Sequence, residues 1–125
     1  GNHDFDAGLD GLVKQLPLAS FSFLNTNYDF SDSPLNDKIQ RYKVFNFDDV
    51  KIGVFGLGIE LEGLVPSDLY GGVRYMNPVE KANTAAYELK HDHKCNYVIC
   101  LSHLGYKYDD KKFSRYRSTF TSSCG

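Results

Sequence analysis

The sequence has 125 residues, of which 42% are hydrophobic, and this length suits one domain but not comfortably two. Its 14 basic and 16 acidic residues give a net charge of −2, which argues against a protein that binds nucleic-acid polymers or anionic membranes through bulk charge. No apolar run approaches the ~20 residues that a membrane-spanning helix needs, so no membrane span is predicted.

The first predicted element is a short helix over residues 5–16. Its apolar residues fall on one helical face, and they are Leu9, Leu12, Val13 and Leu16. Asp6 is the expected N-cap, and Pro17 follows the last turn.

Three predicted strands follow the helix. The first covers 20–28, is rich in Phe and Leu, and ends in polar residues. The other two cover 39–47 and 51–58, and Asp48-Asp49 joins them in a predicted hairpin.

The second half predicts one helix and one buried strand. Residues 77–94 form the clearest helix, with Asn77 as its cap. Its buried stripe is expected to comprise Val79, Ala82, Ala86 and Leu89. Residues 95–102 are almost continuously apolar, as in a strand covered on both faces. Helices that alternate with buried strands predict a layered α/β domain, with functional groups beyond the carboxyl ends of the strands.

The segment 113–125 breaks this pattern, because it has no apolar period and contains no acidic residue. Two explanations stay open. It is a divergent or disordered terminus, or it is a frame-shifted end, since codons exist for 115–118 and 122–125 whose neighbouring frame reads Asp-Ile-Asp and His-Val-Asp. The chain is therefore expected to comprise one domain over 1–112 and an irregular tail over 113–125.

The first four residues, Gly-Asn-His-Asp, are a compact group of chemically active side chains. The carbonyl oxygen of Asn2 is a neutral ligand for a divalent metal. His3 can donate a proton or stabilise developing charge, and Asp4 can hold that imidazole in one tautomer. The alternative interpretation is a tight turn with an incidental histidine.

A second group lies far downstream, where His103 follows the buried strand in "VICLSHLGY". Three further segments precede it in the chain, namely "GNHDFDAGLDGL", "FLNTN" and "KIGVFGLGIE". In their order and spacing, the four segments resemble the calcineurin-like metallophosphoesterases, and among them the 5′-nucleotidase branch. The resemblance covers residues 1–112. It implies that the chain is a fragment of the layered α/β/β/α sandwich of that family.

The resemblance implies a two-metal phosphoester hydrolase. Asn2 and His103 would be ligands of the second metal, His3 would face the phosphate, and Asp4 would orient His3. Two cations ~3.5–4 Å apart hold the phosphate and activate a bridging water in such sites. Ligand types alone do not choose between Mn, Zn, Fe and Co. Asn27, at a strand end, is a candidate on the substrate side.

The resemblance also implies motifs that this sequence lacks, namely Asp-x-His and Gly-Asp before Gly1 and Gly-His-x-His after His103. The chain is therefore expected to be incomplete and inactive alone. The complete enzyme would hydrolyse small phosphate esters, foremost nucleotide 5′-phosphomonoesters, in nucleotide catabolism. An extracytoplasmic location, periplasmic or at the cell surface, is implied because that branch is usually exported. The alternative is a non-catalytic α/β scaffold or a module that binds one metal.

Two further patterns do not predict sites. His91 and His93 are two residues apart at the end of a helix, so their side chains point apart and are expected to be exposed. Gly56 and Gly58 suggest a dinucleotide-binding loop, but Leu61 stands where the third glycine is required and no helix pattern follows.

The three cysteines predict no disulfide framework. On one strand, Cys95 and Cys100 would be ~16 Å apart. A disulfide needs Cα atoms within about 7 Å, so these two are not expected to pair. Cys124 stands alone near the end of the sequence.

Overall fold

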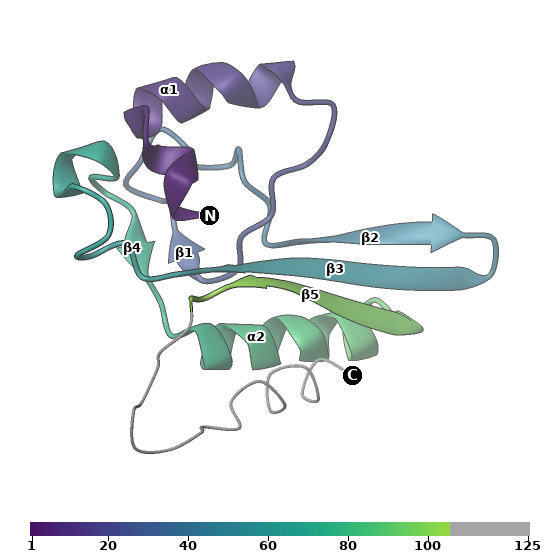
Figure 1. Cartoon of the computed structure of the whole chain (residues 1–125). Helices are drawn as coiled ribbons and strands as arrows, with labels where there is room; N and C mark the ends of the chain where they lie inside the picture. Colours follow the sequence, from purple (N-terminus) through teal and green to yellow (C-terminus); the bar gives the residue numbers. More distant parts are fainter. Residues whose placement is uncertain (106–125) are drawn as a thin grey trace, which may run out of the picture.

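The computed structural model describes residues 1–105, which form two small sheets and two α-helices and confirm the predicted α/β class (Figure 1). In chain order the elements are a 3₁₀ helix at Asn2–Phe5, α1 at Gly8–Gln15, a 3₁₀ turn at Leu16–Leu18, β1 at Tyr28–Asp29, β2 at Tyr42–Phe47, β3 at Val50–Gly58, a 3₁₀ turn at Ser67–Leu69, β4 at Arg74–Tyr75, α2 at Pro78–Tyr87, a π-helical turn at Glu88–Asp92 and β5 at Tyr97–His103. None of the helices within residues 1–105 has the length and apolar character that crossing a bilayer requires.

The larger sheet has the strand order β2-β3-β5. The predicted hairpin is confirmed, because Phe47 pairs with Val50 across the two-residue turn between β2 and β3. β5 runs parallel to β3 after the crossover through α2, and its last residue, His103, pairs with Gly58 at the end of β3. The carboxyl ends of β3 and β5 therefore lie side by side, where α/β folds place their functional groups.

α2 covers one face of this sheet (Figure 1). Its N-cap is confirmed, since Asn77 Oδ1 accepts hydrogen bonds from the amides of Val79 and Glu80 at 3.0 and 3.2 Å. The core between α2 and the sheet consists of Phe55, Leu57, Ala82, Ala85, Leu89, Cys95 and Val98. Val79 was predicted to be buried, but it is 51% exposed, and Ala85 takes the buried position instead.

The opposite face of β5 is open in the described part of the chain. Tyr97, Ile99 and Leu101 are 64%, 45% and 59% exposed. Side chains alternate along a strand, so Val98 and Cys100 point towards α2, whereas the residues that alternate with them point to the other face. Because those residues are exposed, the prediction of a strand covered on both faces is wrong for residues 1–105. Cys95 and Cys100 do not form a disulfide with each other, as expected.

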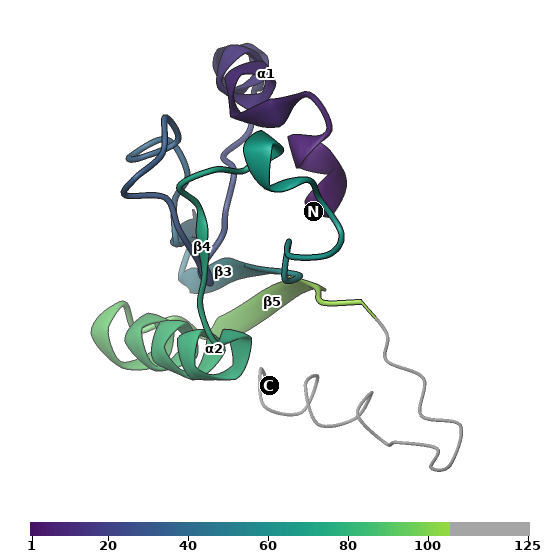
Figure 2. The same ribbon diagram turned by 90° about the vertical axis from the view of Figure 1, so that its left-hand side faces the viewer.

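A second core lies under α1 and beside the two-stranded sheet of β1 and β4, away from α2 (Figure 2). It consists of Phe5, Leu12, Tyr28, Phe30, Leu35, Leu61, Val65 and Val73. The other residues of the predicted stripe on α1 are half-buried against this cluster, namely Leu9, Val13 and Leu16.

Two predictions in the first third of the chain are wrong. Residues 20–28 do not form one strand, since Leu24 makes an isolated bridge to Gln40 and only Tyr28–Asp29 is a strand. The segment instead changes partner, because the amide of Thr26 donates to Gly56 at 2.8 Å. The N-cap of α1 is Ala7 and not Asp6. The predicted irregular end at 113–125 and Cys124 lie outside the described residues.

Candidate functional site

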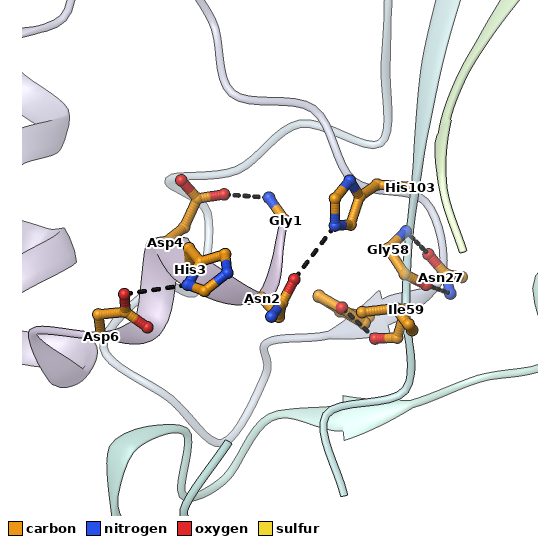
Figure 3. A network of polar contacts seen from close by, with 10 residues as sticks. Gly1, Asn2, His3, Asp4, Asp6, Asn27, Gly58, Ile59 and His103 are labelled. Atoms are coloured by element: carbon orange, nitrogen blue, oxygen red, sulfur yellow. Dashed lines mark hydrogen bonds and ion pairs between the residues drawn. The ribbon is translucent and has the colours of Figure 1, made fainter. Parts of the chain in front are cut away.

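Asn2 and His103 meet at the carboxyl ends of β3 and β5, although 101 positions separate them in the chain (Figure 3). His103 Nε2 lies 3.1 Å from Asn2 Oδ1. The contact is a hydrogen bond when Nε2 carries the proton and donates to the amide oxygen. Without that proton, both atoms are electron-pair donors that face the same point.

The backbone of Gly1 packs against the imidazole of His103. A Cβ atom at this position would lie 3.1 Å from His103 Cδ2 and 3.2 Å from Nε2, which is tighter than ordinary van der Waals contact. A side chain here would push the ring away from Asn2. Glycine at position 1 therefore helps Asn2 Oδ1 and His103 Nε2 to approach each other.

His3 lies beside this pair, with its side chain 84% exposed. Its Nδ1 atom contacts Asp6 Oδ2 at 3.1 Å, whereas the carboxylate of Asp4 contacts the nitrogen of Gly1 (Figure 3). In this structure the carboxylate in contact with His3 is therefore that of Asp6, and the role of Asp4 towards His3 stays a prediction. In a 3₁₀ helix the side chains at i and i+3 lie one above the other, so the partner of His3 is three residues on.

Asn27 is fully buried at the end of β3. Its Nδ2 group donates to the carbonyl oxygen of Gly58 at 2.8 Å, and the amide of Gly58 donates to Asn27 Oδ1 at 2.8 Å. Both polar groups of the side chain are thus bound to backbone. This arrangement favours a structural role for Asn27, and its role towards a substrate stays a prediction.

Sequence analysis did not assign a function to Tyr28, Gly56 or Gly58. A Cβ at Gly56 would lie 2.6 Å from the carbonyl oxygen of Leu24, and one at Gly58 would lie 2.9 Å from Tyr28 Cε2. The signal was in the sequence, because glycine inside a strand often marks the close approach of another segment.

An apolar cavity of about 470 Å³ opens beside the site. The aromatic rings in its wall come from Phe5, Phe21, Phe23, Tyr28 and Phe30. Asp4, Asn25, Ser102 and His103 contribute its polar rim. Of the candidate residues, Asp4 and His103 therefore line this hollow.

The donor set fits part of a metal site. Asn2 Oδ1 and His103 Nε2 are ligand types that borderline divalent cations accept, and a cation can take the place of a proton between them. Within residues 1–105 no cluster of three or more His, Cys, Asp or Glu side chains is placed to hold a metal. The described residues thus supply two candidate ligands for one metal.

No family model matches the chain, but individual known proteins are similar to it. The 5′-nucleotidase of Vibrio vulnificus is 32% identical over 114 residues, which cover 90% of this chain and 20% of that protein. The chain therefore spans about one fifth of the length of this relative.

Two solved structures share the fold. A 5′-nucleotidase precursor from Thermus thermophilus superposes with a TM-score of 0.74 at 32% identity, covering 85% of this chain and 21% of that one. The calcineurin-like phosphoesterase YfkN from Bacillus subtilis gives a TM-score of 0.69 at 26% identity, covering 86% of this chain and 34% of that one.

Proposed function

We propose that this chain contributes to the metal-dependent hydrolysis of phosphate esters. The proposal is supported by the similarity of the chain to a segment that makes up about one fifth of the length of 5′-nucleotidases, and by its similarity in fold to a calcineurin-like phosphoesterase. The observation that carries the proposal is the approach of Asn2 Oδ1 to His103 Nε2 at 3.1 Å. Residues 1–112 are the part of the chain to which the proposal applies.

Asn2 and His103 would hold one divalent cation between them. In phosphoester hydrolysis such a cation, when bound, stabilises the negative charge on the phosphoryl oxygens. One amide oxygen and one imidazole nitrogen do not determine whether this cation is Mn, Zn, Fe or Co. A second cation, as in two-metal hydrolases, would need ligands beyond the two candidates among the described residues.

His3 would act as the proton donor or charge-stabilising group. With its Nδ1 atom in contact with Asp6 Oδ2, the ring of His3 directs its Nε2 atom away from that carboxylate. The imidazole is exposed, so a phosphate ester can reach it. The proton on Nε2 would pass to the leaving oxygen as the ester bond breaks.

The substrate would be a small phosphate ester, foremost a nucleotide 5′-phosphomonoester. This part of the proposal is supported by the 5′-nucleotidase relatives. The description of the Thermus thermophilus relative as a precursor supports a processed, extracytoplasmic enzyme.

A second candidate is a module that binds one metal and does not catalyse hydrolysis. It is favoured by the donor set itself, since residues 1–105 bring together two candidate ligands and no acidic cluster. The 125 residues alone are expected not to hydrolyse nucleotides, because the sequence contains neither Asp-x-His nor Gly-His-x-His.

A chimeric enzyme separates these candidates. Residues 1–105 would replace the homologous segment of the Vibrio vulnificus 5′-nucleotidase, and phosphate release from a nucleotide would be measured with and without a chelator. We expect hydrolysis that the chelator abolishes, and a loss of about 10²- to 10⁴-fold in kcat on His3→Ala.

The matched control is His91→Ala, which removes an exposed histidine far along the chain and should leave kcat unchanged. A folded, metal-loaded chimera whose turnover is indifferent to His3→Ala would contradict the assignment of His3. A folded chimera without any turnover would favour the non-catalytic module.

A further inference from the structure

The segment Thr26–Tyr28 lies against the carboxyl end of β3 and is attached to it at three successive points. The amide of Thr26 donates to the carbonyl of Gly56 at 2.8 Å, and Asn27 binds both backbone groups of Gly58. The hydroxyl of Tyr28 then donates to the carbonyl oxygen of Ile59. The segment therefore holds the last residues of β3 in place.

The ring of Tyr28 extends from this attachment towards the 3₁₀ helix that carries Asn2. It is 7% exposed and meets the ring of Phe5 edge-on, with centroids 6.2 Å apart and an interplanar angle of 63°. Phe5 is the last residue of the Asn2–Phe5 helix and is itself 3% exposed. The position of that helix is thus coupled to the Tyr28 ring by buried aromatic packing.

On its other side, the Tyr28 ring fills the space that a side chain at position 58 would take. Gly58 pairs with His103 in the register of β3 and β5. Tyr28 therefore touches the two structural units that carry the candidate ligands. Burial raises the pKa of Tyr28, with further contributions from Tyr75 and Asp4, so the hydroxyl stays protonated and remains a donor.

We propose that Tyr28 is a positioning residue that sets the separation of Asn2 and His103, by joining the Asn2–Phe5 helix to the end of β3. The proposal rests on the proposed function for its purpose, but its geometry is measurable without any metal or substrate. It assigns no catalytic role to Tyr28, which reaches the candidate ligands only through Phe5 and Gly58.

The test compares the wild-type chain with Tyr28→Phe, which keeps the ring but removes the hydrogen bond to Ile59. Phe5→Leu serves as a second variant, because it loosens the other side of the contact and leaves that hydrogen bond in place. The control is Tyr42→Phe, which removes the hydroxyl that contacts His93 Nε2 at 3.1 Å beside the other core. Circular dichroism would check that each variant is folded.

The first readout is the NMR cross-relaxation between the Gly1 Hα protons and the His103 ring, which reports their distance directly. The second is the concentration of Mn²⁺, added alone, that broadens the Asn2 amide and His103 ring signals, with the Gly1 amine acetylated so that it does not compete. We expect a weaker cross-peak in both variants and an increase of about threefold to tenfold in the Mn²⁺ concentration for Tyr28→Phe. Tyr42→Phe should match the wild type.

The outcomes separate the positioning role from the function. Unchanged cross-peaks in Tyr28→Phe and Phe5→Leu would overturn the positioning role, whether or not the wild type binds Mn²⁺. Weakened cross-peaks in a chain whose wild type shows no Mn²⁺ broadening would support the positioning role and remove support from the proposed metal site. Equal effects in Tyr42→Phe would show a general loss of packing and would overturn the proposal.

Discussion

Asp29 and Arg74 face each other across the two-stranded sheet, and their side chains form an ion pair. The backbone amide of Ser31 also donates to the carboxylate of Asp29 at 3.0 Å. These contacts favour the charged carboxylate, and they lower the pKa of Asp29 from 3.8 to about 2, with the Ser31 hydrogen bonds first and Arg74 after them.

The first prediction is an acid-dependent loss of stability through Asp29. Because its pKa is lower in the folded state than in the unfolded state, Asp29 contributes stability above pH 3.8, and this contribution is lost as the pH falls towards about 2. Asp29→Asn should therefore lower the melting temperature at neutral pH, and the difference from the wild type should shrink between pH 4 and pH 2.

Thermal melts over this pH range would measure the effect. The control is Asp37→Asn, at a carboxylate that makes no ion pair or hydrogen bond within residues 1–105. A difference between Asp29→Asn and the wild type that is the same at pH 2 and pH 7 would show that the carboxylate charge is not the cause.

The second prediction concerns Asn27, whose side chain binds both backbone groups of Gly58. Asn27→Ala leaves a buried N–H and a buried C=O without partners, so the free energy of unfolding should fall by about 2–4 kcal/mol. Urea unfolding would measure it. Asn46→Ala, at an exposed position of β2, should change it by less than about 0.5 kcal/mol, and equal losses in both variants would refute the structural role of Asn27.

The third prediction separates Asp6 from Asp4. In the chimeric enzyme described above, Asp6→Asn should reduce kcat by about 10- to 100-fold, since the carboxylate that contacts His3 Nδ1 is lost. Asp4→Asn removes the same charge from the residue that follows His3, but His3 Nδ1 contacts Asp6 instead, so this change should have the smaller effect. A larger loss for Asp4→Asn would restore the assignment that the sequence alone suggested.

The fourth prediction concerns the open face of β5. Ile99 and Leu101 are large apolar side chains on one exposed face, and exposed apolar surface of this kind binds hydrophobic dyes and promotes association. Replacing both by Thr should reduce the fluorescence of a bound dye while changing the melting temperature little, because Thr keeps a high strand propensity.

The matched change on the covered face is Val98→Thr. Val98 is 9% exposed and packs in the core under α2, so a hydroxyl there should cost about 1–3 kcal/mol of stability without reducing dye binding. Dye fluorescence that is unaffected by the double replacement at 99 and 101 would show that this face is not the exposed apolar surface. In a layered α/β/β/α sandwich, a second sheet is what would cover it.

Local patterns in the sequence were enough for the order of the main elements. The α1 stripe, the hairpin at Asp48-Asp49 and the Asn77 cap were all predictable, because each depends on residues only a few positions apart. The sequence also indicated Asn2 and His103 as candidates, through a resemblance to a family. It did not reveal that Asp6 contacts His3, because the 3₁₀ helix at Asn2–Phe5 was not predicted.

What the sequence determined by itself is therefore the succession of α1, β2, β3, α2 and β5 and the chemical character of its polar segments. The tertiary structure alone decided that His103 reaches Asn2, that Asn27 is buried against Gly58, and that one face of β5 is open. The physical reason is that these contacts depend on strand register and on the path of the chain across the sheet. Both follow from packing between distant segments, such as the Tyr28 ring over Gly58, and no local periodicity encodes them.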